Sequence, residues 1–123
     1  LIRQFPSVSL SEIRLSEIQP SQFFIDEEKL NAVGYFIHSG KDAVIPLCHI
    51  NGQMVSCDGH TRMMAAFLKG SETVLSYEVP SEDYLREFVR EAQNRNIHTV
   101  ADLQILSHET YEKKWIGFCD SFF

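Results

Sequence analysis

The pair Asn51-Gly52 constrains the fold of this chain more than any other local feature. It separates two apolar runs, Val44 to Ile50 and Met54 to Val55. Asn-Gly is the preferred pair of a type I′ turn, because both central positions of that turn take a positive φ angle. The sequence therefore predicts a β-hairpin centred on these two residues.

The predicted hairpin leads directly into a turn that reads Asp58-Gly59-His60-Thr61-Arg62. The apolar residues 63–68 follow, and Lys69-Gly70 then provides the cation and the glycine that are typical of a helix C-terminus. A glycine at such a junction lets a ligand approach the backbone closely, and the first amides of a helix have no partner within it. Anions bind to amides of this kind, so the turn is a candidate phosphate site.

The side chains of the turn suggest the chemistry of that site. Arg62 offers donors that grip phosphate oxygens in pairs, Thr61 a hydroxyl, and His60 a donor or a proton-transfer group. Asp58 could hold a metal ion or orient its neighbours. The alternative is structural: Asp58 caps the helix, Gly59 makes the turn, and Arg62 pairs with an acidic surface neighbour. Spacing alone leaves both interpretations open.

Periodicity predicts the remaining elements. The alternation from Val8 to Ile18 favours a strand, with a bend, that ends at Pro20. Asp26 is expected to cap a helix that carries acidic residues in its first turn and runs toward Gly40. A strand is expected over 73–79, with inward positions at the following residues: Val74, Tyr77 and Val79.

The last third of the sequence is predicted to be entirely helical. Pro80-Ser81 should close the strand and cap a helix over 82–96, and Thr99 and Ser107 each stand where a further N-cap belongs. An aromatic cluster follows and is expected to pack against the core, with an oligomer contact as the alternative if it stays exposed: Trp115, Phe118, Phe122 and Phe123. We expect one α/β (α+β) domain over 1–123, with a core at 8–79 and helices over 81–123.

Charge and composition narrow the range of partners. The net charge is −6 and the basic residues are scattered, which disfavours duplex DNA as a partner. No apolar run approaches the length of a membrane span, and the start of the chain lacks both a methionine and a secretion signal, as in a processed end. The three cysteines (Cys48, Cys57 and Cys119) form no disulfide or zinc motif, and the histidines are dispersed. We expect a cytoplasmic protein without structural zinc.

The run from Met54 to Ala66, preceded by Ile45-Pro46-Leu47 and followed by a predicted strand, resembles the ParB/sulfiredoxin superfamily. In that superfamily a strand ending in proline is followed by a helix, a "PI" strand, a hairpin and a Gly-x-x-Arg turn that opens a helix. The resemblance covers residues 8–79. The five-residue form of the turn is similar to that of free-serine kinases that use ADP as phosphate donor, and of related ParB-like proteins.

The resemblance implies roles for the turn. Gly59, His60, Thr61 and Arg62 would contact the phosphates of ADP or ATP, or of CTP as in chromosome-partitioning ParB proteins. Asp58 would lie close to the transferred group, and Mg²⁺ would arrive with the nucleotide.

Several positions depart from the family pattern. Sulfiredoxins place a reactive cysteine where this chain has His60, so thiol repair chemistry is not expected. The kinases place a catalytic glutamate where this chain has Gln22, and an amide cannot accept a proton. Glu27 or Glu28 could substitute, with Glu28 taken as the candidate base, or both could be ordinary acidic residues at a helix N-terminus. Partitioning ParB proteins have two arginines in the turn, whereas this chain has only Arg62.

The leading hypothesis is a nucleotide- or phosphate-binding domain that transfers phosphate to a small hydroxyl compound, with Asp58, His60 and Glu28 as candidate catalytic residues. The kinases also carry a further C-terminal segment that holds the amino acid, so serine specificity does not transfer. The first alternative is a non-catalytic nucleotide-binding or protein-interaction module, and the second is a DNA-partitioning-related protein that acts through another subunit. Oligomerisation remains open in each case.

Overall fold

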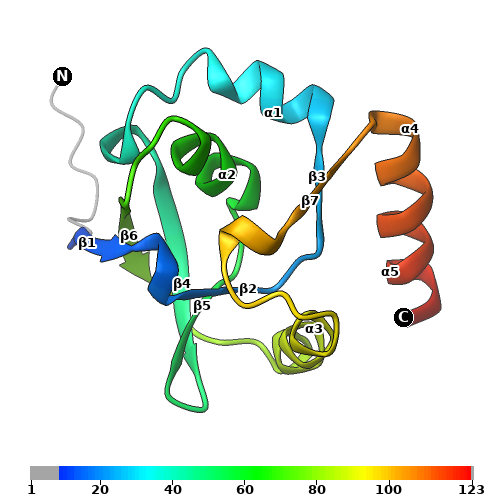
Figure 1. The fold of residues 1–123 in the computed structure, drawn as a ribbon. Helices are drawn as coiled ribbons and strands as arrows, with labels where there is room; N and C mark the ends of the chain where they lie inside the picture. Colours follow the sequence, from blue (N-terminus) through cyan, green and yellow to red (C-terminus); the bar gives the residue numbers. More distant parts are fainter. Residues whose placement is uncertain (1–8, 123) are drawn as a thin grey trace, which may run out of the picture.

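The computed structural model describes residues 9–122, so the predicted position of Phe123 and the predicted start of the first strand at Val8 lie outside the described residues. Five strands form one mixed sheet in the order β1-β6-β4-β5-β2, and two further strands, β3 and β7, pair separately in parallel (Figure 1). The strands are β1 (Ser11–Arg14), β2 (Ile18–Pro20), β3 (Phe24–Asp26), β4 (Val44–Ile50), β5 (Gln53–Ser56), β6 (Thr73–Glu78) and β7 (Gln104–Leu106). The fold is therefore a small α+β domain, as the sequence predicts.

Helices cover the sheet and continue to the end of the described chain. The α-helices are α1 (Glu27–Gly34), α2 (His60–Leu68), α3 (Asp83–Asn94), α4 (His108–Tyr111) and α5 (Gly117–Phe122). Three 3₁₀ turns, η1 (Leu15–Glu17), η2 (Gly40–Asp42) and η3 (Val100–Asp102), and a π-helical turn, η4 (Glu112–Ile116), complete the structure. None of the described helices has the length and apolar character needed to cross a membrane.

The predicted hairpin is confirmed. β4 and β5 pair antiparallel with Ile50 opposite Gln53, and the φ angles of Asn51 and Gly52 are +51° and +79°. These positive angles at both central residues are the requirement that made Asn-Gly diagnostic. The hairpin fixes where β5 ends and hence where α2 can begin.

The predicted bent strand near the N-terminus is two strands joined by a 3₁₀ turn. β1 pairs with β6 at one edge of the sheet and β2 pairs with β5 at the other, although only η1 separates them in the chain. The five strands must therefore curl toward a closed ring. Leu15 in the connecting turn is buried, which explains the apolar residue at that place in the alternation.

The predicted helix after Asp26 is confirmed at its start and corrected at its end. The Asp26 side chain accepts a hydrogen bond from the Glu28 amide, as an N-cap does. The helix ends at Gly34, well before Gly40, and leaves Tyr35 and Phe36 80% and 78% exposed. The apolar spacing suggested a longer helix because it treated these two aromatic residues as buried.

The predicted strand over 73–79 is confirmed as β6, with a correction to its inward face. Val74 and Ser76 are the buried positions, whereas Tyr77 and Val79 are half-buried. The next helix, α3, begins at Asp83 and its N-cap position is held by Glu82 without a side-chain cap, so the predicted cap at Ser81 is wrong.

The prediction of an all-helical C-terminal third is wrong in one respect. Residues 104–106 form β7, which pairs with β3 in the register Phe24–Gln104, Ile25–Ile105 and Asp26–Leu106. A strand of three residues shows too little alternation to be recognised in a sequence. Ser107 does cap the following helix, as predicted, and accepts a hydrogen bond from the Thr110 amide.

Two apolar clusters form the core. The larger lies between the sheet, α1, α2 and the C-terminal segment, and the smaller lies between the β4–β5 hairpin and α3. Trp115 and Phe118 pack edge-on against the fully buried Phe23, with ring centroids 5.4 and 4.9 Å away. The predicted packing of these two aromatic residues against the core is confirmed.

Candidate phosphate-binding site

The predicted turn lies at the junction of β5 and α2. Gly59 is the N-cap residue of α2 with a φ of +80° and no side-chain cap, and the first helical hydrogen bond runs from the Met63 amide to the Gly59 carbonyl. A Cβ atom at Gly59 would lie 3.1 Å from both Ile45 Cδ1 and Arg62 Nη2. Glycine is therefore required here by the backbone angle and by the neighbouring atoms.

A cavity of about 410 Å³ opens at this end of α2. All five residues of the turn line it. α1 and α4 complete its wall, and two of the residues that they contribute, Lys29 and Tyr111, were not predicted. The turn thus faces a space large enough for a small ligand, with Lys29 and Arg62 both on its wall.

Arg62, one of the residues that line the cavity, is held in place by the sheet. Its Nη1 donates a hydrogen bond of 2.9 Å to the Val44 carbonyl. Among residues 9–122, no carboxylate lies within ion-pair distance of the guanidinium. The alternative prediction, in which Arg62 pairs with an acidic neighbour, is therefore wrong, and the other N–H groups of the guanidinium are not taken up by a carboxylate.

His60 is buried to 2% exposure, and its ring joins α2 to the strand ends. Nε2 accepts a hydrogen bond of 3.1 Å from the Ser21 amide and lies 2.9 Å from Ser56 Oγ. Because an amide can only donate, Nε2 must be an acceptor, and the proton of the neutral ring is on Nδ1. Burial lowers the pKa of His60 to about 4, against the opposing effect of Asp58, so the ring is neutral near pH 7.

The Nδ1–H group of His60 is the one buried side-chain nitrogen or oxygen without a hydrogen-bond partner in the described part of the chain. An unpaired buried donor of this kind costs about 1–3 kcal/mol. This ring is suited to donating a hydrogen bond from Nδ1. It is poorly suited to act as a base, because Nε2 is already occupied and the pKa is low.

The carboxylate of Asp58 accepts a hydrogen bond from the first backbone amide after it in the turn. Its Oδ1 accepts a hydrogen bond of 2.7 Å from the Gly59 amide, which precedes the helix proper. The amides of His60, Thr61 and Arg62 belong to the first turn of α2 and have no acceptor within the helix. The carboxylate of Asp58 therefore lies next to the helix N-terminus and is the acceptor for the amide of the N-cap residue, Gly59.

Gln22 and Glu28, the two positions considered for a catalytic base, lie in different surroundings in the structure. Gln22 lines the cavity together with the turn. The Glu28 side chain is 76% exposed, is not among the residues lining the cavity, and lies 3.9 Å from His108. The position expected for a base is thus next to the turn but holds an amide.

Lys29 and Tyr111 were missed because no local pattern marks them. Lys29 lies on α1 and its Nζ is 5.7 Å from the centre of the Tyr111 ring on α4. These residues are 82 positions apart in the sequence, and only the packing of the C-terminal segment against α1 brings them together. A lysine three residues after a helix cap is otherwise an ordinary surface residue.

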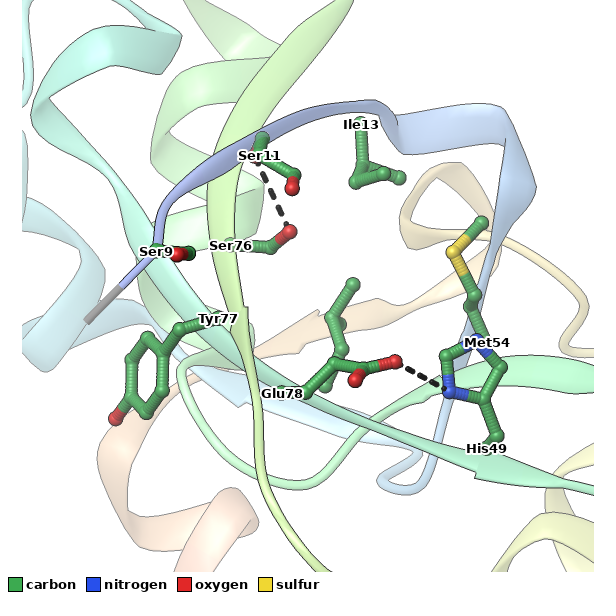
Figure 2. A pocket seen from close by; sticks show the side chains of 9 residues that line it. Ser9, Ser11, Ile13, His49, Met54, Ser76, Tyr77 and Glu78 are labelled. Carbon is green, nitrogen blue, oxygen red and sulfur yellow. Dashed lines mark hydrogen bonds and ion pairs between the residues drawn. The ribbon is translucent and has the colours of Figure 1, made fainter.

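A second cavity of about 440 Å³ lies at the open mouth of the curled sheet (Figure 2). Its polar groups are engaged with one another: Ser76 Oγ donates to the Ser11 carbonyl, and His49 Nδ1 lies 3.0 Å from Glu78 Oε1. The Tyr77 ring points away from the space in Figure 2. Among residues 9–122, those that line this cavity include none of the predicted site residues and no lysine or arginine.

Cysteine chemistry is disfavoured beside the turn. Burial, together with a hydrogen bond to the Cys48 thiol, raises the pKa of Cys57 to about 12. A thiol in this state is a poor nucleophile, because the thiolate is the reactive form. In the described range, no group of three or more His, Cys, Asp or Glu side chains is placed to hold a metal ion.

Comparisons with known proteins bear on the fold alone. No protein-family model matches the chain, and no curated protein sequence matches it. Among solved structures, the crystal structure of protein Atu1540 from Agrobacterium tumefaciens is similar, with a TM-score of 0.58 and 18% sequence identity. The match covers 82% of this chain and 64% of that one, so this chain spans less than two thirds of that protein. At this identity the likeness is one of architecture.

Proposed function

We propose that this chain binds the phosphate groups of a nucleotide or of another small phosphorylated compound in the cavity between α1 and the N-terminus of α2. The observation that carries the proposal is the convergence of Lys29 and Arg62 on one cavity at a helix N-terminus that has no side-chain cap. Positive side chains, free helix amides and a neutral N–H donor are the groups that bind phosphate oxygens.

The resemblance to the ParB/sulfiredoxin superfamily agrees with this assignment and suggests ADP, ATP or CTP as the ligand. Mg²⁺ would then bridge the phosphates and Asp58, since this ion needs only one or two carboxylates in addition to phosphate oxygens. We place the protein in the cytoplasm, where nucleotides are abundant and where Cys48, Cys57 and Cys119 would stay reduced, as the structure has them.

Titration calorimetry with pyrophosphate, ADP, ATP and CTP, each with and without Mg²⁺, tests the binding site. Arg62→Ala should weaken binding of the preferred ligand by roughly 10- to 100-fold, the effect of losing a charged hydrogen bond of about 1.5–3 kcal/mol. Arg90→Ala is the matched control, because Arg90 is an exposed arginine on α3 that pairs with Glu87 at 3.3 Å. Unchanged affinity in a folded Arg62→Ala protein would show that the site is assigned wrongly.

Phosphoryl transfer to a small hydroxyl compound is the second candidate function. Asp58 beside the helix N-terminus favours it, because a carboxylate there could hold the Mg²⁺ that would neutralise charge on the transferred phosphate. Gln22 opposes it, because the wall of the cavity then lacks the expected base. A non-catalytic module with the same ligand is the alternative.

Phosphorus NMR with ADP, Mg²⁺ and a panel of hydroxyl amino acids separates these two functions. Gln22→Glu should raise the rate of phosphoester formation by about 10²-fold or more, the usual contribution of a general base. Formation that persists unchanged in Glu28→Gln would exclude Glu28 as that base. If neither the wild type nor Gln22→Glu forms a phosphoester while ADP still binds, the chain is a binding module.

A further inference from the structure

The C-terminal segment supplies Tyr111 to the wall of the cavity. His108 in the same segment contacts Asp26 at the start of α1. β3 and β7 run in parallel with Asp26 beside Leu106, so α1 and α4 begin side by side (Figure 1). Lys29 follows Asp26 by three residues, and Tyr111 follows His108 by three residues. The two residues that the cavity receives from these helices are therefore each about one helical turn from the contact between them.

That contact is a hydrogen-bonded ion pair. The Asp26 side chain is 1% exposed, and its Oδ1 accepts from the Glu28 amide at 3.0 Å while its Oδ2 lies 2.6 Å from His108 Nδ1. The other ring nitrogen, Nε2, lies 2.9 Å from Glu112 Oε1. Glu28 Oε2 is 3.9 Å from Nδ1. The ring thus faces Asp26 from β3, Glu28 from α1 and Glu112 from η4.

This geometry requires a protonated histidine. Carboxylates only accept hydrogen bonds, so Nδ1 and Nε2 must both carry protons to satisfy Asp26 and Glu112. The Asp26 hydrogen bond raises the pKa of His108; partial burial opposes it, and the charges of Asp26, Glu112 and Glu28 add to the increase. In return, burial pushes the pKa of Asp26 upward, but the hydrogen bonds from His108 and from the amides of Glu28 and Lys29 outweigh it and lower that pKa overall.

We propose that protonated His108 is a positioning residue for the phosphate site. It holds α4 against α1 so that Tyr111 and Lys29 lie together on the cavity wall, and ligand affinity falls when His108 loses its proton. This inference rests on the proposed function. It adds that the site is completed by the C-terminal segment and that the contribution of this segment to ligand affinity is lost as the pH rises through the pKa of His108.

The sign and the range of this effect follow from linkage. A histidine whose folded-state pKa is raised contributes fully below its unfolded value of about 6.5, and the contribution disappears as the pH rises through the folded-state value. Because coupling between two equilibria is reciprocal, a ligand that needs α4 in place must raise the pKa of His108 further when it binds.

The test is an ADP titration by calorimetry between pH 6 and pH 9 on wild type, His108→Gln and His98→Gln. His98 is the matched control, because it is an exposed histidine whose backbone amide, bonded to Asp102, survives the substitution. The wild type and His98→Gln should bind ADP roughly fivefold or more tightly than His108→Gln at pH 6, and this ratio should approach one at high pH. Ionisation of ADP itself affects all three proteins alike and cancels in the ratio.

Glu112→Gln provides a variant that leaves the buried Asp26 contact intact. It should move the pH midpoint of the affinity change downward by roughly 0.2–0.7 pH units, as expected for loss of an exposed ion pair. NMR of the His108 ring should show a higher pKa in the presence of ADP than in its absence, in wild type and in Glu112→Gln.

The outcomes separate this inference from the proposed function. Equal ADP affinities of wild type and His108→Gln at every pH, or a His108 pKa that ADP does not change, would overturn the role of His108 and leave the phosphate site in place. ADP binding that is absent, or that is insensitive to Arg62→Ala, would overturn both. If His108→Gln does not fold, the Glu112→Gln midpoint and the ring titration decide.

Discussion

The N-termini of α1 and α2 differ in how the chain satisfies them. At α1, a buried aspartate caps the helix and a protonated histidine balances its charge. At α2, the cap position is Gly59, which has no side chain, and the nearby carboxylate bonds only the Gly59 amide. The α2 end also faces a cavity whose wall carries Lys29 and Arg62. The first helix end is capped by the protein's own side chain, whereas the second has no side-chain cap and faces the cavity.

The largest loss of stability should come from removing the side-chain cap of α1. Asp26→Ala should lower the free energy of unfolding by about 3–4 kcal/mol, because it removes an N-cap and a charged hydrogen bond together. Urea unfolding at pH 6 measures this loss. Asp26→Asn should retain most of the capping contribution, since asparagine is also a good N-cap, and should lose the ion pair.

Asp58→Ala is the counterpart at the N-terminus of α2. Because Asp58 bonds only the amide of the next residue in a partly exposed turn, this change should cost about 1 kcal/mol or less. Equal losses for Asp26→Ala and Asp58→Ala would show that the two helix ends do not differ as described.

The next effect is a loss of protein stability on acidification, caused by protonation of His60 at the N-terminus of α2. A pKa lowered from 6.5 to about 4 means that the unfolded chain binds the proton first, so stability is lost as the pH falls from 6.5 toward 4. At roughly 1.4 kcal/mol for each pH unit, this amounts to about 3 kcal/mol. Unfolding free energies of wild type and His60→Gln across this range measure it, and parallel curves for the two proteins would contradict it.

The two histidines therefore act on opposite sides of pH 6.5. His60 makes the protein less stable below that pH, whereas His108 makes it less stable above, because its own pKa is raised. The difference in unfolding free energy between wild type and His108→Gln should be constant between about pH 5, where Asp26 is ionised, and pH 6.5, and should shrink as the pH rises further. A difference that grows with pH would contradict the protonated state assigned to His108.

A smaller loss of stability is expected when a methyl group is added at the N-cap position of α2. Gly59→Ala should cost about 2 kcal/mol, of which about 1 is backbone strain at positive φ and the rest is the approach of Cβ to Ile45 and Arg62 at 3.1 Å. Gly52→Ala is the matched control, because its φ is +79° and no atom of the described part of the chain lies within 4 Å of the added atom. Only Gly59→Ala should also weaken pyrophosphate binding, and equal losses in both variants would argue against the close packing at the turn.

The smallest effect concerns the charge beside the N-terminus of α2. Asp58→Asn removes a negative charge next to the proposed phosphate position and should raise the affinity for pyrophosphate without Mg²⁺ by roughly two- to fivefold. The same variant should bind less tightly than wild type when Mg²⁺ is present, because the ion loses a carboxylate ligand. Calorimetry with and without Mg²⁺ measures this reversal in the relative affinities of Asp58→Asn and wild type. The absence of any Mg²⁺ effect in wild type would remove Asp58 as a ligand of the ion.

The elements that the sequence predicted well share one property, which is that a few adjacent residues decide them. Asn51-Gly52 imposes positive φ angles, Asp26 and Ser107 cap helices through amides two or three residues away, and the glycine before His60 opens α2. The family resemblance and the nucleotide stay predictions, as do the catalytic roles of Asp58 and His60, although the structure does bring the whole turn to one cavity.

The local sequence thus determined the hairpin, the turn and the helix starts, because torsion preferences and capping act within a few residues. Tertiary structure alone decided that β7 lies beside β3, that His108 meets Asp26 across 82 positions, and that Lys29 and Tyr111 share a cavity with Arg62. These contacts join segments with no common period or motif, and they depend on the free energy of packing the C-terminal aromatic residues against Phe23. The burial of the His60 ring, which leaves it neutral and unsuited to act as a base, is also tertiary, because its partner Ser21 lies 39 positions away in the sequence.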